Sequence, residues 1–143
     1  MVKSFFLKRN NMATINRFED LQIWQMAREY CKLIYPLTCV GAFARDFKLK
    51  DQINGASGSI MDNIAEGFER NGKLEMIQFL SIAKGSCGES RSQLYRALDR
   101  AYITEEQMNH LCQLSENISN KIGSFITYLN NTEHKGLKFK DRK

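Results

Sequence analysis

Proline is nearly absent from this chain: its 143 residues include only Pro36. Because proline interrupts helices, its scarcity leaves room for long ones. Long hydrophobic runs are absent too, and none approaches the roughly 20 residues that span a bilayer. The opening VKSFFLKRNN has too short an apolar centre for a secretory signal. With a hydrophobic fraction of 43%, the sequence predicts one globular helical domain with no membrane segment.

Groups that hold metals or perform covalent chemistry are also scarce. No C-x-x-C pair occurs among the four cysteines, and three of them fall on apolar helical positions, which favours reduced core thiols of a cytoplasmic protein: Cys31, Cys39, Cys87 and Cys112. The two histidines, His110 and His134, belong to no Glu-x-x-His sequence, so a ferritin-type metal site is not expected. No strand-to-helix phosphate loop is present, and no Ser or Cys has a His partner nearby in sequence. We therefore expect no enzyme activity, no metal and no cofactor.

The net charge of +5 belongs to the two ends of the chain. Residues 1–17 carry four basic side chains and no acidic one, residues 134–143 carry five basic side chains against one acid, and the middle is left at −3. We expect a mobile basic arm over residues 1–15, a folded domain over residues 16–131 and a basic tail over residues 132–143. Met12 is an alternative start to Met1. A basic isoelectric point that belongs to the tails is weak support for nucleic-acid binding by the whole domain.

Hydrophobic periodicity predicts two helices in the first half. The first begins near Phe18, with Asn16 as its cap, and Pro36 kinks or ends it. Its apolar residues cover so much of the circumference that we expect two neighbouring helices, or one neighbour and a partner subunit. Residues 39–44 read as a connection. Asp46 caps the second helix, which extends to about Arg70 and has this core stripe: Leu49, Ile53, Ala56, Ile60 and Ile64.

Two further helices follow the turn at Asn71–Gly72. The third is expected over about residues 73–101, with this seam: Met76, Leu80, Ala83, Cys87, Ser90, Leu94, Ala97 and Ala101. The fourth begins with a capping box at Thr104 and Gln107 and frays near residue 130. Four helices of roughly 30–40 Å with short connections predict an all-α, antiparallel up-down-up-down four-helix bundle.

Glycines and polar residues gather near the middle of the second and third helices. Glycine lowers helix stability by about 1 kcal/mol relative to alanine, a cost that is tolerated where another helix approaches closely. We therefore expect the two glycine-rich segments, residues 55–59 and 85–88, to face each other. In that arrangement four polar residues could meet: Asn63, Glu66, Ser86 and Glu89. Two carboxylates brought together inside a bundle could bind a metal or act as acid and base, whereas a hydrogen-bonded structural network is the favoured alternative.

Five segments of the chain resemble the bacterial four helix bundle protein family, which includes proteins encoded in 23S rRNA intervening sequences. They are FEDLQIWQMA (18–27), LKDQI (49–53), SIMDNIAEG (59–67), FLSIAKGSCGES (79–90) and YIT (102–104). The family is similar to the accessory variability determinant of diversity-generating retroelements. The resemblance covers about residues 17–130. It implies an antiparallel four-helix bundle, often a homopentamer, with nucleic-acid binding in some members and no established enzyme activity.

Basic residues outside the tails are the remaining candidates for binding a nucleic acid. Six of them pair at helical spacing or bracket a turn: Arg70, Lys73, Lys84, Arg91, Arg96 and Arg100. For any one of these residues a solvated helix face is the favoured interpretation, but repetition in an oligomer would concentrate their charge. The leading hypothesis is a homo-oligomer that binds RNA or DNA through the phosphate backbone. The alternatives are a scaffold for a partner protein, such as a nearby-encoded nucleic-acid enzyme, and a hydrolase using Glu66 and Glu89.

Overall fold

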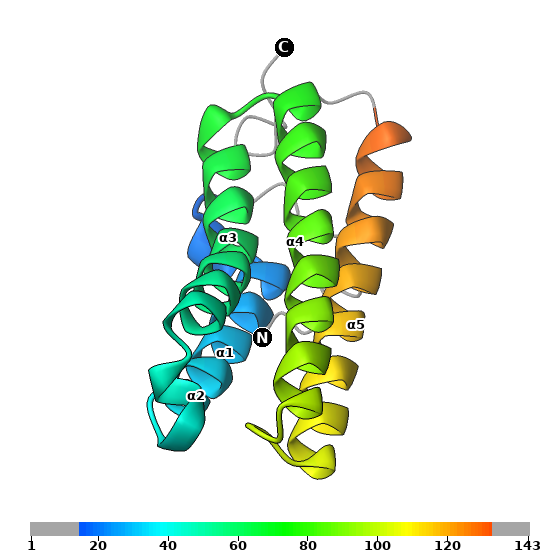
Figure 1. The fold of residues 1–143 in the computed structure, drawn as a ribbon. Helices are drawn as coiled ribbons and strands as arrows, with labels where there is room; N and C mark the ends of the chain where they lie inside the picture. The colour runs from blue at the N-terminus through cyan, green and yellow to red at the C-terminus, as the bar shows by residue number, and fades with distance from the viewer. Residues whose placement is uncertain (1–14, 133–143) are drawn as a thin grey trace.

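The structure is a computed structural model that describes residues 15–132, and within that range it consists of helices and turns. In chain order the elements are a 3-10 turn η2 (Phe18–Asp20), α1 (Gln22–Leu37), α2 (Gly41–Arg45), α3 (Phe47–Arg70), α4 (Lys73–Asp99) and α5 (Glu105–Asn130). The helices α3, α4 and α5 run side by side along the whole bundle, and α1 packs against α3 and α5 (Figure 1). The predicted all-α bundle is confirmed. None of the described helices is long and apolar enough to cross a membrane.

The first helix is shorter than expected. Its 16 residues make α1 about 24 Å long, well below the predicted 30–40 Å. Asn16 does not cap it, because the chain first forms η2 and then an extended residue, the fully buried Leu21. Pro36 lies in the last turn and the helix ends one residue later, which confirms the predicted break.

The connection predicted between the first two long helices contains a short helix of its own. In α2, Gly41 has a positive φ of 62° and opens the turn that carries Phe43 inward. Phe43 is 2% exposed and stacks on Tyr102, with ring centroids 5.0 Å apart. The sequence gives little signal for so short an element, because five residues cannot show helical periodicity.

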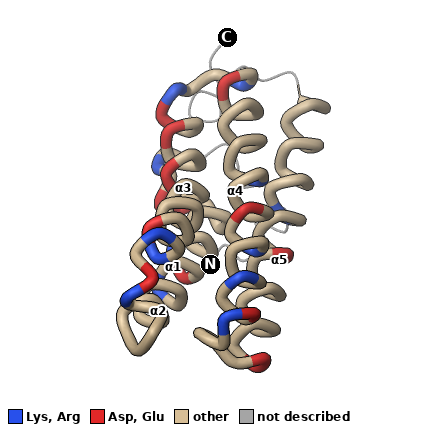
Figure 2. The backbone as a smooth tube through the Cα atoms, viewed as in Figure 1, with Lys and Arg blue, Asp and Glu red and all other residues tan. Residues whose placement is uncertain are grey.

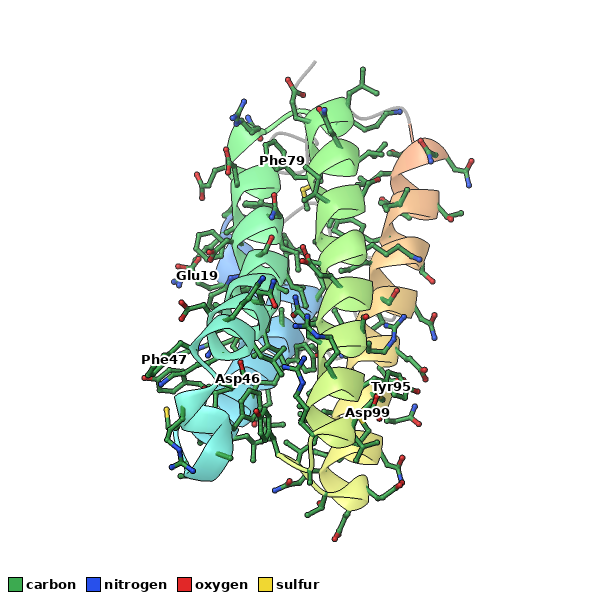
Figure 3. The ribbon with its side chains drawn as sticks, in the orientation of Figure 1. Glu19, Asp46, Phe47, Phe79, Tyr95 and Asp99 are labelled. Carbon is green, nitrogen blue, oxygen red and sulfur yellow. The ribbon has the colours of Figure 1, made fainter. Side chains whose placement is uncertain are left out.

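Asp46 joins the start of α3 to the end of α4 (Figure 3). Its Oδ1 accepts the Leu49 N–H at 3.2 Å, as predicted for a cap, while its Oδ2 accepts the Tyr102 hydroxyl at 2.9 Å and Arg100 Nη1 at 2.8 Å. Hydrogen bonding from Tyr102 and the Leu49 amide, together with Arg100, lowers the pKa of Asp46 below its ordinary value. One carboxylate thus fixes a helix start, a helix end and the loop beyond it.

At the opposite end, Asn71 adopts the left-handed conformation with a φ of 63° and turns the chain from α3 into α4. The capping box at Thr104 and Gln107 forms as predicted, with N···O distances of 3.0 and 2.9 Å. Ala101 was placed in the seam of α4, but α4 ends at Asp99, and Ala101 is exposed with a φ of 61°. The rest of the seams predicted for α3, α4 and α5 is buried in one core.

Candidate functional site

Two of the four polar residues singled out in the sequence, Asn63 and Ser86, form one hydrogen-bonded group with Ser59 between α3 and α4. Asn63 Nδ2 donates to both the backbone oxygen and the Oγ of Ser59, at 2.8 Å each. Ser86 Oγ on α4 donates to the same Ser59 Oγ at 3.0 Å. This contact satisfies polar groups at the α3–α4 seam and sets the register of the two helices. The group is structural, as the favoured alternative predicted for Asn63 and Ser86, but it contains no carboxylate.

The two carboxylates do not join that group. Glu66 accepts Arg70 Nη2 at 2.9 Å in an exposed i, i+4 ion pair, and Glu89 lies 3.5 Å from Gln93 Nε2. Because Ser59 pairs with Ser86, Glu66 is level with a point on α4 about ten residues from Glu89, which is about 15 Å along the helix. The pair therefore shares no site, and no group of three or more His, Cys, Asp or Glu gathers among residues 15–132.

The two glycine-rich segments meet through the Ser59–Ser86 hydrogen bond, but their glycines do not line the contact as predicted. A Cβ added at Gly55, Gly58 or Gly85 would meet nothing within 4 Å, and one at Gly88 would meet only the Arg91 guanidinium at 3.9 Å. The close approach is at Gly67 instead, where a Cβ would lie 2.8 Å from Phe79 Cβ. Gly67 stands three residues after Ile64 on the predicted buried stripe, and that spacing was the available signal.

A buried polar group links α1, α4 and α5 and was not singled out in the sequence. The Tyr30 hydroxyl lies 2.8 Å from Ser90 Oγ, while Ser90 and Ser115 both donate to the backbone oxygen of Cys87. Burial raises the pKa of Tyr30 to about 12 and that of Cys87 to about 11. Arg91 Nη1 reaches in from the surface to Ser115 Oγ at 3.2 Å. The signal available in the sequence was a serine at a buried helix position, Ser90 on α4 and Ser115 on α5.

Two of the six predicted basic residues lie together at the α3–α4 turn. Arg70, besides its ion pair with Glu66, stacks its guanidinium over the Phe79 ring at 5.2 Å. Lys73 Nζ donates to the backbone oxygen of Thr132 at 2.6 Å. The turn and the end of the described part of α5 are therefore held at the same end of the bundle.

The other four basic residues are distributed along α4. Arg91 reaches Ser115, Arg96 Nη1 donates to Gln52 Oε1 at 3.1 Å, and Arg100 pairs with Asp46. Lys84 is exposed and forms no ion pair within residues 15–132. Acidic residues interleave with the basic ones on α3 and α4 (Figure 2). The described faces of α3 and α4 therefore carry no continuous basic stretch.

Comparison with known proteins places the chain in a family. A sequence model described as 23S rRNA-intervening sequence protein matches residues 19–124. Among solved structures, a protein of unknown function from the S23 ribosomal protein family of Bacteroides thetaiotaomicron has a similar fold, with a TM-score of 0.67 and 23% identity over 73% of this chain and 95% of that one. No curated protein sequence matches. The chain therefore belongs to the 23S rRNA-intervening sequence protein family.

Proposed function

We propose that this protein is a non-enzymatic homo-oligomer that binds RNA or DNA through contacts between basic side chains and the phosphate backbone. The observation that carries the proposal is the hydrogen bond from Lys73 to Thr132, at 2.6 Å. It holds the end of α5 beside the turn that carries Arg70 and Lys73. The basic run of residues 134–143 starts two residues later in the sequence.

Oligomerisation supplies the charge density that one copy lacks. Five of the six predicted basic residues are engaged within the chain, so a single bundle offers few free cations to a phosphate backbone. A cyclic homo-oligomer brings the same end of every copy to one side of the assembly. A pentamer, the state implied by the family resemblance, would bring five copies of the turn together and would carry five copies of the basic sequence of residues 134–143. Such a surface binds nucleic acid without sequence preference and is sensitive to salt.

Fluorescence anisotropy with labelled RNA and duplex DNA at rising salt tests this function. We expect binding at low salt, and we expect the logarithm of the binding constant to fall linearly with the logarithm of the salt concentration. Replacing Lys138 and Lys140 with Gln lowers the slope by about two, because each phosphate contact contributes about one. The matched control replaces Arg45 and Lys48 with Gln. Both residues are exposed at the other end of the bundle, so this variant should keep the slope of the natural chain. Absence of binding at low salt contradicts the proposal.

A second candidate function is a scaffold for a partner protein, such as a nucleic-acid enzyme encoded nearby. It is favoured by three large apolar side chains exposed where α1, α2 and α3 meet: Tyr35, Val40 and Phe47, at 56%, 64% and 71%. Phe47 points away from the bundle (Figure 3). Replacing Val40 and Phe47 with Ser then abolishes capture of that enzyme and leaves RNA binding unchanged. A variant that still captures the enzyme but no longer binds RNA would reject the scaffold function.

A further inference from the structure

The outward face of α4 carries a second heptad stripe, separate from its buried seam. Successive steps of four and three residues connect its members, which we call the α4 stripe: Leu74, Gln78, Ser81, Gly85, Gly88, Ser92 and Tyr95. None is charged, and the apolar residues at its two ends, Leu74 and Tyr95, are 75% and 56% exposed. A strict heptad of this kind is the pattern by which one helix packs along another.

The neighbouring helix shows what an ordinary solvated face looks like in this protein. The outward positions of α3 include Phe47 and the open Gly55 and Gly58, but these alternate with charged residues: Lys48, Asp51, Asp62, Glu66 and Glu69. On the α4 stripe the middle is instead Ser81, Gly85, Gly88 and Ser92. The space beside Gly85 is empty, so its cost in helix stability, about 1 kcal/mol relative to alanine, is not explained by any contact within residues 15–132.

Charges of opposite sign flank the α4 stripe at a spacing that is self-complementary. Lys84 lies on the side of α5 and Glu89 on the side of α3, five residues apart. In parallel helices packed through heptad stripes, these are the positions that form ion pairs between one helix and the next. Neither side chain forms an ion pair within the described chain. Ile77 and Ile82 stand at the same spacing seven residues, or about two turns, earlier and would form an apolar contact of the same kind.

A buried polar atom beside Glu89 also lacks a partner. Gln93 is 4% exposed, and its Nε2 lies 3.5 Å from Glu89 Oε2. Gln93 Oε1 has no hydrogen-bond partner among the described residues. Leaving such an acceptor unsatisfied costs about 1–3 kcal/mol. The exposed Glu89 carboxylate beside this buried amide is the acceptor that an ammonium or guanidinium group arriving from outside the chain can reach.

We propose that copies of this chain pack around a rotation axis roughly parallel to α4, stripe against stripe, with Lys84 of each copy donating to the Glu89–Gln93 site of the next. The inference rests on the homo-oligomer proposed above and names its contact. Arg91 and Arg96 occupy the next pair of flanking positions, where two positive charges would repel each other. Each guanidinium is instead turned toward its own chain, Arg91 to Ser115 and Arg96 to Gln52. The arrangement closes for any cyclic number of copies, since each copy both gives and receives the pair.

Charge reversal tests the pairing. Lys84→Glu and Glu89→Lys should each weaken self-association by about tenfold or more, equal to about 1.4 kcal/mol, measured by sedimentation over a concentration series. The double variant restores the opposite charges across the contact and should regain most of the association. If the double variant associates no better than the single ones, the proposed pair is wrong.

Gly85→Leu tests the contact surface itself. The variant should remain folded by circular dichroism, because nothing lies within 4 Å of the added Cβ, but lose self-association. Gly58→Leu is the matched control, since Gly58 is equally open but lies on α3, and it should associate like the natural chain. If Gly85→Leu associates normally, another face forms the oligomer and only this inference fails. If the natural chain is a monomer, the oligomer and its contact both fail.

Discussion

Gly67 and Gly58 are both helical glycines of α3, but their surroundings differ completely. Gly67 is buried against α4, and a Cβ there would lie 2.8 Å from Phe79 Cβ and 3.3 Å from Met76 Sδ. Gly58 faces empty space, as Gly85 does on α4. The fold of a single chain requires a glycine at position 67. It does not require one at position 58 or 85, so the space beside these two glycines is open to a contact from outside the bundle.

The largest effect is expected at the tight position. Gly67→Ala places a methyl group where the Phe79 Cβ already lies, and neither backbone can yield without moving a helix. We expect the free energy of unfolding to fall by about 1–3 kcal/mol, as for other overpacked cores. Urea unfolding measures it. A variant as stable as the natural chain would show that α3 and α4 are not in close contact there.

Tyr30→Phe probes the buried polar group that joins α1 to α4. The substitution keeps the ring but removes the hydroxyl that lies 2.8 Å from Ser90 Oγ. Ser90 retains its bond to the Cys87 oxygen, so the expected loss is about 1 kcal/mol in the free energy of unfolding. Ser92→Ala, on the exposed face of the same helix, is the control. An equal effect of both substitutions would contradict the distinction between the two faces.

Gly58→Ala should stabilise the protein, whereas Gly67→Ala should destabilise it. With no neighbour to displace, alanine gains helix propensity, so the free energy of unfolding should rise by about 0.5–1 kcal/mol. The same urea titration measures it. A loss of stability would mean that Gly58 contacts something within the bundle.

Asp46 gives the stability of the bundle a dependence on pH. Its pKa is lowered in the folded state, so its contribution to stability is present above the ordinary carboxyl pKa and lost as the pH falls through the lowered value. Between pH of about 6 and about 3, the natural chain should lose more stability than Asp46→Asn does. Urea midpoints at each pH measure this, and parallel profiles would contradict it.

The smallest effect is expected at Glu66. Its ion pair with Arg70 has both side chains about half exposed, at 52% and 53%, where such pairs contribute little. Glu66→Gln should therefore change the free energy of unfolding by less than about 0.5 kcal/mol. A variant that fails to fold would restore Glu66 to the core of the bundle and overturn its placement here.

The long helices and the buried seams of α3 and α5 could be predicted from sequence, because periodicity and caps such as Asp46 and Thr104 are local signals. The orientation of the glycines was predictable in principle, since Gly67 stands three residues after Ile64 on the buried stripe and Gly58 falls outside it. The helix α2 was not predictable, because five residues cannot show helical periodicity. The separation of Glu66 from Glu89 was in principle predictable. A turn at Asn71–Gly72 fixes the register of two antiparallel helices, and counting back from it places the two carboxylates at different heights.

The comparison of α3 with α4 also supports the contact proposed for Gly85. The α4 stripe has no charged member and is flanked by Lys84 and Glu89, which form no ion pair among residues 15–132, whereas charged residues alternate with Gly55 and Gly58 on the outward face of α3. No contact among the described residues accounts for that contrast. The self-association proposed above would account for it, and it would also supply the repeated basic surface that nucleic-acid binding requires.

The mass of the natural chain in solution tests this account most directly. Light scattering coupled to size exclusion should give a multiple of the 16.5 kDa chain mass, five-fold for the pentamer implied by the family resemblance. Gly85→Leu, measured beside it, should elute as a folded single chain. A natural chain of 16.5 kDa at every concentration would contradict the account, because its basic surface and its α4 stripe would both be left without a partner.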